Sequence, residues 1–354
     1  MSAIETILDR PSFTLEELLE EDEVLQECRS ENAKLLNFLT LPATLEKLVE
    51  VRSLRRMQAA VRVGSTRHGF FFVFSFFLFP FFFLCFAVFR RLMLPSFQYI
   101  TVEPDASADS VRKFKYPFIS CEILCCDVWS LSEAIYQHPQ LIDRLYGFLE
   151  RDAPLSPALA AHVSKVAGSL LEKKPEATLQ YLRGRPGMVD HFVRHLSSSA
   201  VMDLLLKIIS CDEEGGGTLD WLCTNELIPK LVDKFAPENG SEVHEHAAHA
   251  LADIVQVSVL NKNSPLMAQL ESKDMVEKLL AYMFGDSKGS SSALYHGLDV
   301  MTELVKRHVL DAPETDQKLS DCPAALQVIV SRLPQLQSLL SAEGCSYCCL
   351  PRRR

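Results

Sequence analysis

The sequence predicts an all-α protein built as a HEAT- or armadillo-like helical-repeat solenoid. Apolar residues recur at spacings of three and four through most of the 354-residue chain, as they do on one face of a helix. Short segments rich in Gly, Pro and Ser separate these periodic segments, and the chain has no convincing run of strand-like alternation. The repeats are expected to be degenerate, since no strict sequence period stands out. A Phe-rich hydrophobic insert interrupts the pattern.

The first part of the helical domain is expected over residues 1–50. Thr14 and Glu17 have the spacing of a capping box, in which each side chain bonds a free backbone N–H at the start of a helix. A helical apolar face then extends from residue 15 to residue 39, and a short helix is expected over 45–49.

The segment from Phe70 to Phe89 has the length and hydropathy of a membrane span. It holds 20 residues, of which 12 are phenylalanine and none is charged. Pro80 lies in its middle, and Arg67 and Arg90 flank it on both sides, so the distribution of basic residues indicates no orientation. A membrane anchor is therefore the alternative interpretation of this segment.

The favoured interpretation of residues 51–98 is a retained intron that is translated in frame. Residues 51–53 can be encoded by a sequence that begins like a splice donor, and residues 96–98 by one that ends like an acceptor. Removing the insert joins Glu50 to Tyr99, and the helical apolar spacing then continues across the junction. Sequencing the transcript across this junction tests the hypothesis.

The helical domain is expected to continue over residues 99–342, and residues 343–354 form an atypical tail. The apolar spacing predicts helices over 141–149, 157–171, 175–182, 189–196, 201–209, 219–235, 243–259, 276–284, 293–305 and 324–340.

The stretch from Val189 to Cys211 is the clearest helix pair of the chain. Its two apolar stripes are separated by the polar triplet 197–199, and Ser199 is expected to be the N-cap of the second helix. Met202 and Leu206 widen the second stripe, so the pair cannot bury its apolar surface alone. It needs helix pairs on both sides, which is how a solenoid is built.

Composition narrows the possible partners and the compartment. The formal net charge of −10 argues against nucleic acid or an anionic membrane, because binding phosphates needs a basic surface. Eleven cysteines without a secretory signal indicate reduced, mostly buried thiols. The expected localisation is therefore cytoplasmic, or nuclear, with a membrane only if residues 70–89 form a true span.

The strongest metal candidate is the group His244, His246 and His249. It resembles the zinc-protease pattern, but position 248, where the second histidine should stand, is alanine. His246 and His249 can share a helix face, yet a third ligand is not evident. Packed or cap-lining histidines are favoured, and a metallohydrolase is the least favoured function.

Two further motifs are too weak to indicate a site. Gly215 to Gly217 lacks the preceding strand and following Lys-Ser/Thr of a phosphate loop. Cys345, Cys348 and Cys349 lack the second cysteine pair of a zinc site. No catalytic residue, cofactor or metal is expected, and the chain is interpreted as an interaction surface and not as an enzyme.

Several stretches, in this order along the chain, resemble the SAPS-domain family, the regulatory subunits of protein phosphatase 6. They are EEDEVLQECRSENAKLLNFL (20–39), KYPFISCEIL (115–124), LIDRLYGFL (141–149), LSPALAAHVSKV (155–166), VDHFVRHLSSSAVMDLLLKIISC (189–211) and DWLCTNELIPKLVDKFAP (220–237). The resemblance implies a non-catalytic helical-repeat scaffold that binds a phosphatase 6-type catalytic subunit and directs its substrate choice or location. Family members also join ankyrin-repeat partners, and the family domain is expected to run further than this chain.

The resemblance implies no active site, so the candidate residues are partner contacts. They are the polar residues of the matched stretches that we expect to be exposed: Lys115, Tyr116, His195, Ser198, Asp203 and Trp221. The alternative for each is structural. Tyr116 and Trp221 are then half-buried anchors, and Asp203 interacts with the dipole at the first turn of its helix.

Overall fold

The computed structural model describes residues 2–49, 100–104, 107–211, 217–260, 264–285, 291–311 and 323–341. These residues form helices joined by turns, with no strand among them, so the all-α prediction is confirmed. The chain divides into two compact units. Unit 1 comprises Met1–Arg151 and Ser156–Lys173, and unit 2 comprises Asp152–Leu155 and Lys174–Arg354.

The Phe-rich insert and the atypical tail lie outside the described residues. The retained-intron and membrane-span hypotheses for residues 51–98 therefore stay predictions, as does the assignment of residues 343–354 to a tail. Among the residues that are described, we find no helix with both the length and the apolar character needed to cross a bilayer.

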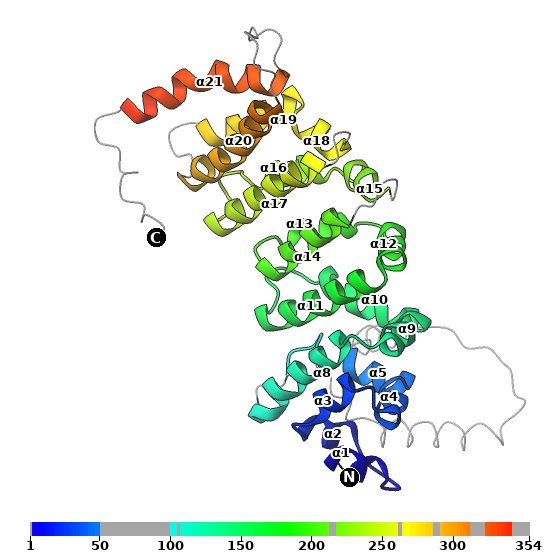
Figure 1. Ribbon diagram of the computed structural model, residues 1–354. Coiled ribbons are helices and arrows are strands. Elements are labelled where there is room, and N and C mark those ends of the chain that lie inside the picture. The colour runs from blue at the N-terminus through cyan, green and yellow to red at the C-terminus, as the bar shows by residue number, and fades with distance from the viewer. Residues whose placement is uncertain are drawn as a thin grey trace, which may run out of the picture. The chain divides into compact units, whose positions relative to one another are not determined.

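In unit 1, α8 packs against helices from both sides of residues 51–98 (Figure 1). Its elements are α1 (Ala3–Leu8), α2 (Leu15–Glu20), α3 (Val24–Arg29), α4 (Ala33–Leu39), α5 (Pro42–Val49), the π-helical turn η1 (Val111–Lys115), α8 (Tyr116–Cys125), α9 (Trp129–Gln137), α10 (Pro139–Gly147), η2 (Phe148–Glu150) and α11 (Pro157–Lys173). α8 contacts α2, α3, α5 and α11. It therefore joins the helices that precede residues 51–98 to those that follow.

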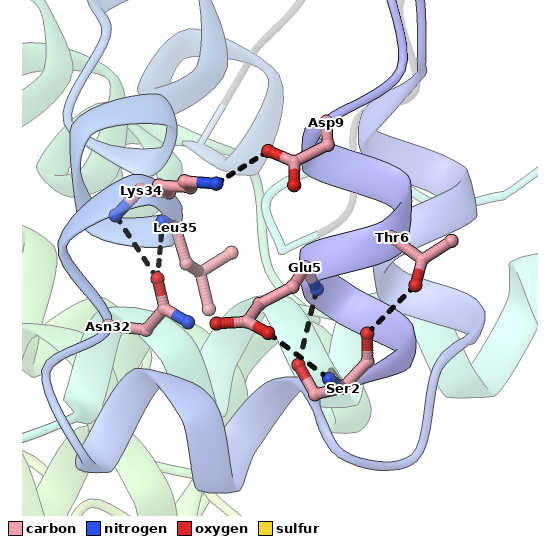
Figure 2. Close-up of polar contacts among 7 residues, drawn as sticks. All are labelled: Ser2, Glu5, Thr6, Asp9, Asn32, Lys34 and Leu35. Atoms are coloured by element: carbon pink, nitrogen blue, oxygen red, sulfur yellow. Dashed lines mark hydrogen bonds and ion pairs between the residues drawn. The ribbon is translucent and has the colours of Figure 1, made fainter.

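Polar side chains fix the starts of the first helices (Figure 2). Ser2 and Glu5 form a capping box on α1, since Glu5 N donates to Ser2 Oγ at 3.2 Å and Ser2 N donates to Glu5 Oε2 at 3.3 Å. The Asn32 side chain accepts from two backbone N–H groups at the start of α4. Lys34 Nζ lies 2.5 Å from Asp9 Oδ1 and links α4 to the end of α1.

The apolar face predicted over 15–39 is divided among three short helices, α2, α3 and α4. Thr14 caps α2 as predicted, because its Oγ1 accepts from Glu17 N at 3.3 Å, although the Glu17 carboxylate bonds the Thr14 hydroxyl and not its backbone. The break before α4 lies at Glu31, whose φ of 56° is in the left-handed region and ends α3. The apolar spacing did not reveal this reversal.

Unit 2 is made of ten described helices, the last of which follows the repeats. They are α12 (Pro175–Gly184), α13 (Met188–Arg194), α14 (Ser199–Ser210), α15 (Thr218–Thr224), α16 (Leu227–Asp233), α17 (Ser241–Leu260), α18 (Pro265–Leu270), α19 (Lys273–Phe284), α20 (Ser291–Asp311) and α21 (Ala324–Ser341).

The first nine of these helices form three successive repeats of three. Helices in the same position of successive repeats contact one another: α12 with α15 and α15 with α18, α13 with α16 and α16 with α19, and α14 with α17 and α17 with α20 (Figure 1). Equivalent helices begin about 40 to 50 residues apart, close to the period of HEAT and armadillo repeats. A repeat of three helices is typical of armadillo proteins. Of the two predicted types, HEAT-like and armadillo-like, the repeats of unit 2 are therefore of the armadillo type.

The helix pair predicted from Val189 to Cys211 is present as α13 and α14. Both predicted stripes are buried, Phe192 and Leu205 at 0% exposure. The predicted N-cap is wrong by one residue: Ser198 is the N-cap, its side chain makes no capping bond, and Ser199 is the first residue of α14. The link between the two helices is the four residues from His195 to Ser198, and it begins two residues before the polar triplet 197–199 that the sequence suggested.

The helix predicted over 219–235 is also divided, into α15 and α16. Glu226 has a φ of 59° and separates the two helices. The division produces the three-helix repeat, because α15 joins α12 and α18 while α16 joins α13 and α19. One long helix in this place would have given a two-helix repeat.

Candidate partner-binding surface

Unit 1 exposes an aromatic ridge, formed by Phe114 in η1 and Phe118 in α8. Their side chains lie four residues apart and are 71% and 52% exposed, and Val111, one turn earlier, is 36% exposed. The opposite face of α8, with Ile119 and Ile123, is buried against the neighbouring helices.

Apolar residues occur on several sides of α8, although Glu122, one turn after Phe118, pairs with Lys165 of α11. The described helices that contact α8 leave Phe118 exposed. Exposed aromatic side chains of this kind mark interaction sites.

Lys115 and Tyr116 attach this ridge to α2. Lys115 Nζ donates to the Glu20 carbonyl oxygen at 2.7 Å and lies 3.1 Å from Asp22 Oδ1. The Tyr116 hydroxyl donates to Glu20 Oε1 at 2.5 Å. Burial raises the pKa of Tyr116, and its hydrogen bond to Glu20 raises the pKa further. Tyr116 is 3% exposed, so its expected exposure is wrong, and both residues hold the start of α8 in place.

Changing Tyr116 to Phe removes this hydroxyl and leaves the ring. We expect the free energy of unfolding of unit 1 to fall by about 0.5–1.5 kcal/mol, because one intramolecular hydrogen bond is lost. Urea unfolding measures the change. Tyr295→Phe is the matched control, since Tyr295 is 47% exposed. An equal effect of both variants would contradict the role of the Tyr116 hydroxyl.

Unit 2 presents a polar face on α14. Ser199, Asp203 and Lys207 are exposed along one side of this helix, and Leu204 and Ile208 are buried on the other. The other predicted contacts are less accessible: Ser198 and Trp221 are half-buried and His195 is buried. The expected exposure of His195 is therefore wrong. Lys115 and Tyr116 belong to unit 1 and the other four predicted residues to unit 2.

Two of the candidate metal histidines, His244 and His246, act in packing, whereas His249 is exposed. Nε2 of His244 lies 3.2 Å from the Ala236 carbonyl oxygen, so this nitrogen donates and Nδ1 accepts from Ser292 Oγ at 2.7 Å. His246 Nδ1 donates to the Leu196 carbonyl oxygen at 2.6 Å. These bonds fix α17 against α20 and against the turn after α13. Across the described part of the chain, no cluster of three or more His, Cys, Asp or Glu is placed to hold a metal.

Acid is expected to destabilise the protein through His296, which is buried in α20. Burial lowers the pKa of His296 below its usual 6.5, although Glu245 and Asp299 partly oppose this. The unfolded chain therefore takes up a proton before the folded chain does. The stability that His296 contributes in its neutral form is fully present above pH 6.5. It falls as the pH decreases from 6.5 toward the pKa of His296 in the folded protein.

The measurement compares the urea midpoint of the wild type and of His296→Gln at about pH 7.5 and about pH 5.5. We expect the variant to lose less stability on acidification than the wild type. His138→Gln is the control, because His138 belongs to unit 1 and is not among the groups that shift the pKa of His296. If His296→Gln and the wild type lose stability equally, His296 does not contribute to the destabilisation by acid.

The repeat region of unit 2 matches a known protein family. The family model described as SIT4 phosphatase-associated protein (SAPS) matches residues 167–343, which is half of the chain. The chain belongs to the SAPS family. The match covers all three armadillo-type repeats of unit 2, so these repeats are the fold of a SAPS domain in this chain.

Matches to curated relatives extend into unit 1. Serine/threonine-protein phosphatase 6 regulatory subunit 3-B of Xenopus laevis is 30% identical over 362 residues, which cover 96% of this chain and 36% of the relative. Regulatory subunit 1 of Mus musculus is 29% identical over 364 residues, with 99% and 37% covered. Extragenic suppressor of kinetochore protein 1 of Schizosaccharomyces pombe is 32% identical over 323 residues, with 88% and 33% covered. The chain thus spans about a third of the length of these SAPS proteins.

Sequence reasoning missed the aromatic ridge. Phe118 lies inside the stretch KYPFISCEIL, but only the polar residues of that stretch were considered as partner contacts. The available signal was the composition of α8, where apolar residues occur on several sides of the helix. Such a helix needs either full burial or a partner.

Proposed function

We propose that this chain is a non-catalytic SAPS-type regulatory subunit that binds a phosphatase 6-type catalytic subunit and directs its substrate choice or location. The observation that carries the proposal is membership in the SAPS family, together with relatives named as regulatory subunits of this phosphatase. The repeat fold supports it, because stacked helices present extended surfaces to large protein partners.

We propose the aromatic ridge as the anchor of the phosphatase contact in unit 1. Phe114 and Phe118 would bury large rings in the partner, and aromatic residues are enriched among the side chains that dominate binding energy. Lys115 and Tyr116 then act by positioning the ridge through Glu20.

The residues predicted in unit 2 complete the proposed contact set. Asp203 is the exposed one among them, and it lies on the polar face of α14. Ser198 and Trp221 would contribute their accessible atoms, whereas the buried His195 would act by supporting the turn between α13 and α14.

We propose that residues 1–50 and 99–342 are two parts of one SAPS-like domain, with 51–98 as an insert and 343–354 as a tail. Core side chains on both sides of the insert support this division. Leu48 before it, and Ile100 and Thr101 after it, are all 0% exposed. We also propose a cytoplasmic or nuclear location, because eleven cysteines favour a reducing compartment. Ankyrin-repeat partners are a further proposal, which the family resemblance implies.

Affinity capture of the full chain from a eukaryotic cell extract, analysed by mass spectrometry, tests the proposed function. We expect enrichment of a phosphatase 6-type catalytic subunit over a capture with an unrelated helical-repeat protein. Failure to recover a phosphatase catalytic subunit with chain that has a helical circular dichroism spectrum would contradict the proposal.

A membrane-anchored helical protein remains the second candidate, and it depends on residues 70–89. Alkaline extraction of membranes separates the two functions, because an integral protein stays in the pellet and a peripheral or unattached one does not. The regulatory-subunit proposal predicts extraction into the supernatant.

A further inference from the structure

An acidic loop lies beside the aromatic ridge of unit 1. The loop consists of Glu20, the last residue of α2, and the three acidic residues that follow it as far as Glu23. Lys115, which follows Phe114 of the ridge, donates through Nζ to the Glu20 carbonyl oxygen at 2.7 Å and lies 3.1 Å from Asp22 Oδ1. These bonds hold the loop against the turn of helix that carries the ridge.

The carboxylates of the acidic loop are accessible to a partner. The Asp22 side chain is 96% exposed even though it pairs with Lys115. Glu23 is exposed and Glu21 is half-buried, and the side chains of both make no hydrogen bond or ion pair with the residues that the structure describes. Exposed carboxylates close together produce a negative potential that extends into the solvent.

The cations of η1 do not cancel this charge. There are three of them, Arg112, Lys113 and Lys115, against the four carboxylates of the acidic loop. Lys115 is already bound by the loop. The edge of the ridge that faces the loop is therefore negative.

The backbone at the ridge is unusual. η1 is π-helical, since Tyr116 N donates to the Val111 carbonyl oxygen, five residues earlier. Pro117 favours this wider turn, because it has no N–H for the carbonyl group four residues before it and its ring crowds that carbonyl. Single π-helical turns occur frequently at functional sites, so the backbone supports the ridge as a contact site independently of its exposed rings.

We propose that the aromatic ridge and the acidic loop form one docking surface, and that the phosphatase catalytic subunit meets it with an apolar pocket bordered by Lys or Arg side chains. This inference rests on the proposed regulatory function and specifies the surface that the partner presents. Two exposed rings beside a row of carboxylates match the usual anatomy of an interface, which has an apolar core and a polar rim. Acidic side chains of a partner at this edge would be repelled.

The ridge and the loop contribute differently to binding. The rings of Phe114 and Phe118 supply affinity, because large side chains buried at the centre of an interface dominate its energy. The carboxylates stay at the rim, where charges mainly raise the rate of association and reject partners of the wrong charge. Salt screens exposed charges, so association with the partner should slow as the ionic strength increases.

Surface plasmon resonance of the full chain with a purified phosphatase 6-type catalytic subunit tests the inference. We expect the association rate constant to fall about tenfold or more between about 50 mM and about 500 mM NaCl, and the dissociation rate constant to change less. The Glu21→Lys, Glu23→Lys double variant should associate about tenfold more slowly than the wild type at the lower salt concentration, and its rate should lose most of the dependence on salt.

Asp127→Lys combined with Glu238→Lys is the matched control, because it makes the same change in net charge at two exposed acidic residues outside the ridge and the loop. Asp127 follows the residue that caps the far end of α8, and Glu238 belongs to unit 2. We expect this control to associate within about twofold of the wild type. Circular dichroism confirms that both double variants are folded.

Wild-type binding at a rate that does not depend on salt, or equal effects of the two double variants, would overturn the proposal and leave the regulatory function in place. Absence of any binding by the wild type would instead contradict the regulatory function, and this inference with it.

Discussion

Replacing Phe114 and Phe118 together by serine is expected to weaken binding of the phosphatase catalytic subunit by about 100-fold or more. Truncating a side chain that anchors an interface costs about 2 kcal/mol or more, and each 1.4 kcal/mol is about a tenfold change in affinity. The fold should tolerate the change, because both rings are more than half exposed. Biolayer interferometry gives the dissociation constant, and thermal unfolding confirms that the fold persists.

Tyr295→Ser is the matched control for this double variant. It removes another exposed aromatic ring, in α20 of unit 2, outside the proposed ridge. We expect it to leave the affinity within about twofold of the wild type. Equal affinities of the wild type and the ridge variant would show that the phosphatase binds elsewhere, and Asp203→Lys on α14 would then be the next variant to measure.

Phe192→Ala is expected to lower the free energy of unfolding by about 3–5 kcal/mol. Phe192 is 0% exposed in α13, which contacts both α14 and α16, so its removal leaves a cavity at the start of the armadillo-type repeats. This loss is a large share of the 5–15 kcal/mol typical of folded proteins. Urea unfolding followed by circular dichroism measures it.

Arg194→Ala is the control for Phe192→Ala, because Arg194 lies on the same helix and is exposed. We expect its effect to be within about 0.5 kcal/mol of zero. A loss of less than about 1 kcal/mol for Phe192→Ala would mean that the α13–α14 pair is not part of the core of unit 2.

Apolar spacing alone predicted the class of fold and much of the core. Phe192, Leu205 and Ile208 all have the burial that their helical spacing indicates, because a helix that packs on neighbours must bury one stripe. The boundaries were less predictable. Glu31 and Glu226 adopt left-handed backbone conformations that residues other than glycine seldom take. A glutamate in the sequence therefore does not indicate that the helix breaks there.

The candidate site was harder to predict than the core. Spacing identifies apolar residues, but whether another helix covers them depends on contacts between distant parts of the chain. Tyr116 is buried because Glu20, far away in the sequence, accepts its hydrogen bond. Phe118, two residues later, is exposed because the helices around α8 leave its side uncovered. Neither the burial of Tyr116 nor the exposure of Phe118 can be predicted from a single sequence.

The most direct test of the account is a calorimetric titration of the purified full chain with a purified phosphatase 6-type catalytic subunit. We expect saturable one-to-one binding that the Phe114→Ser, Phe118→Ser double variant loses. Absence of binding heat, together with separate elution of two folded proteins in size-exclusion chromatography, would contradict the assignment of this SAPS protein as a phosphatase regulatory subunit.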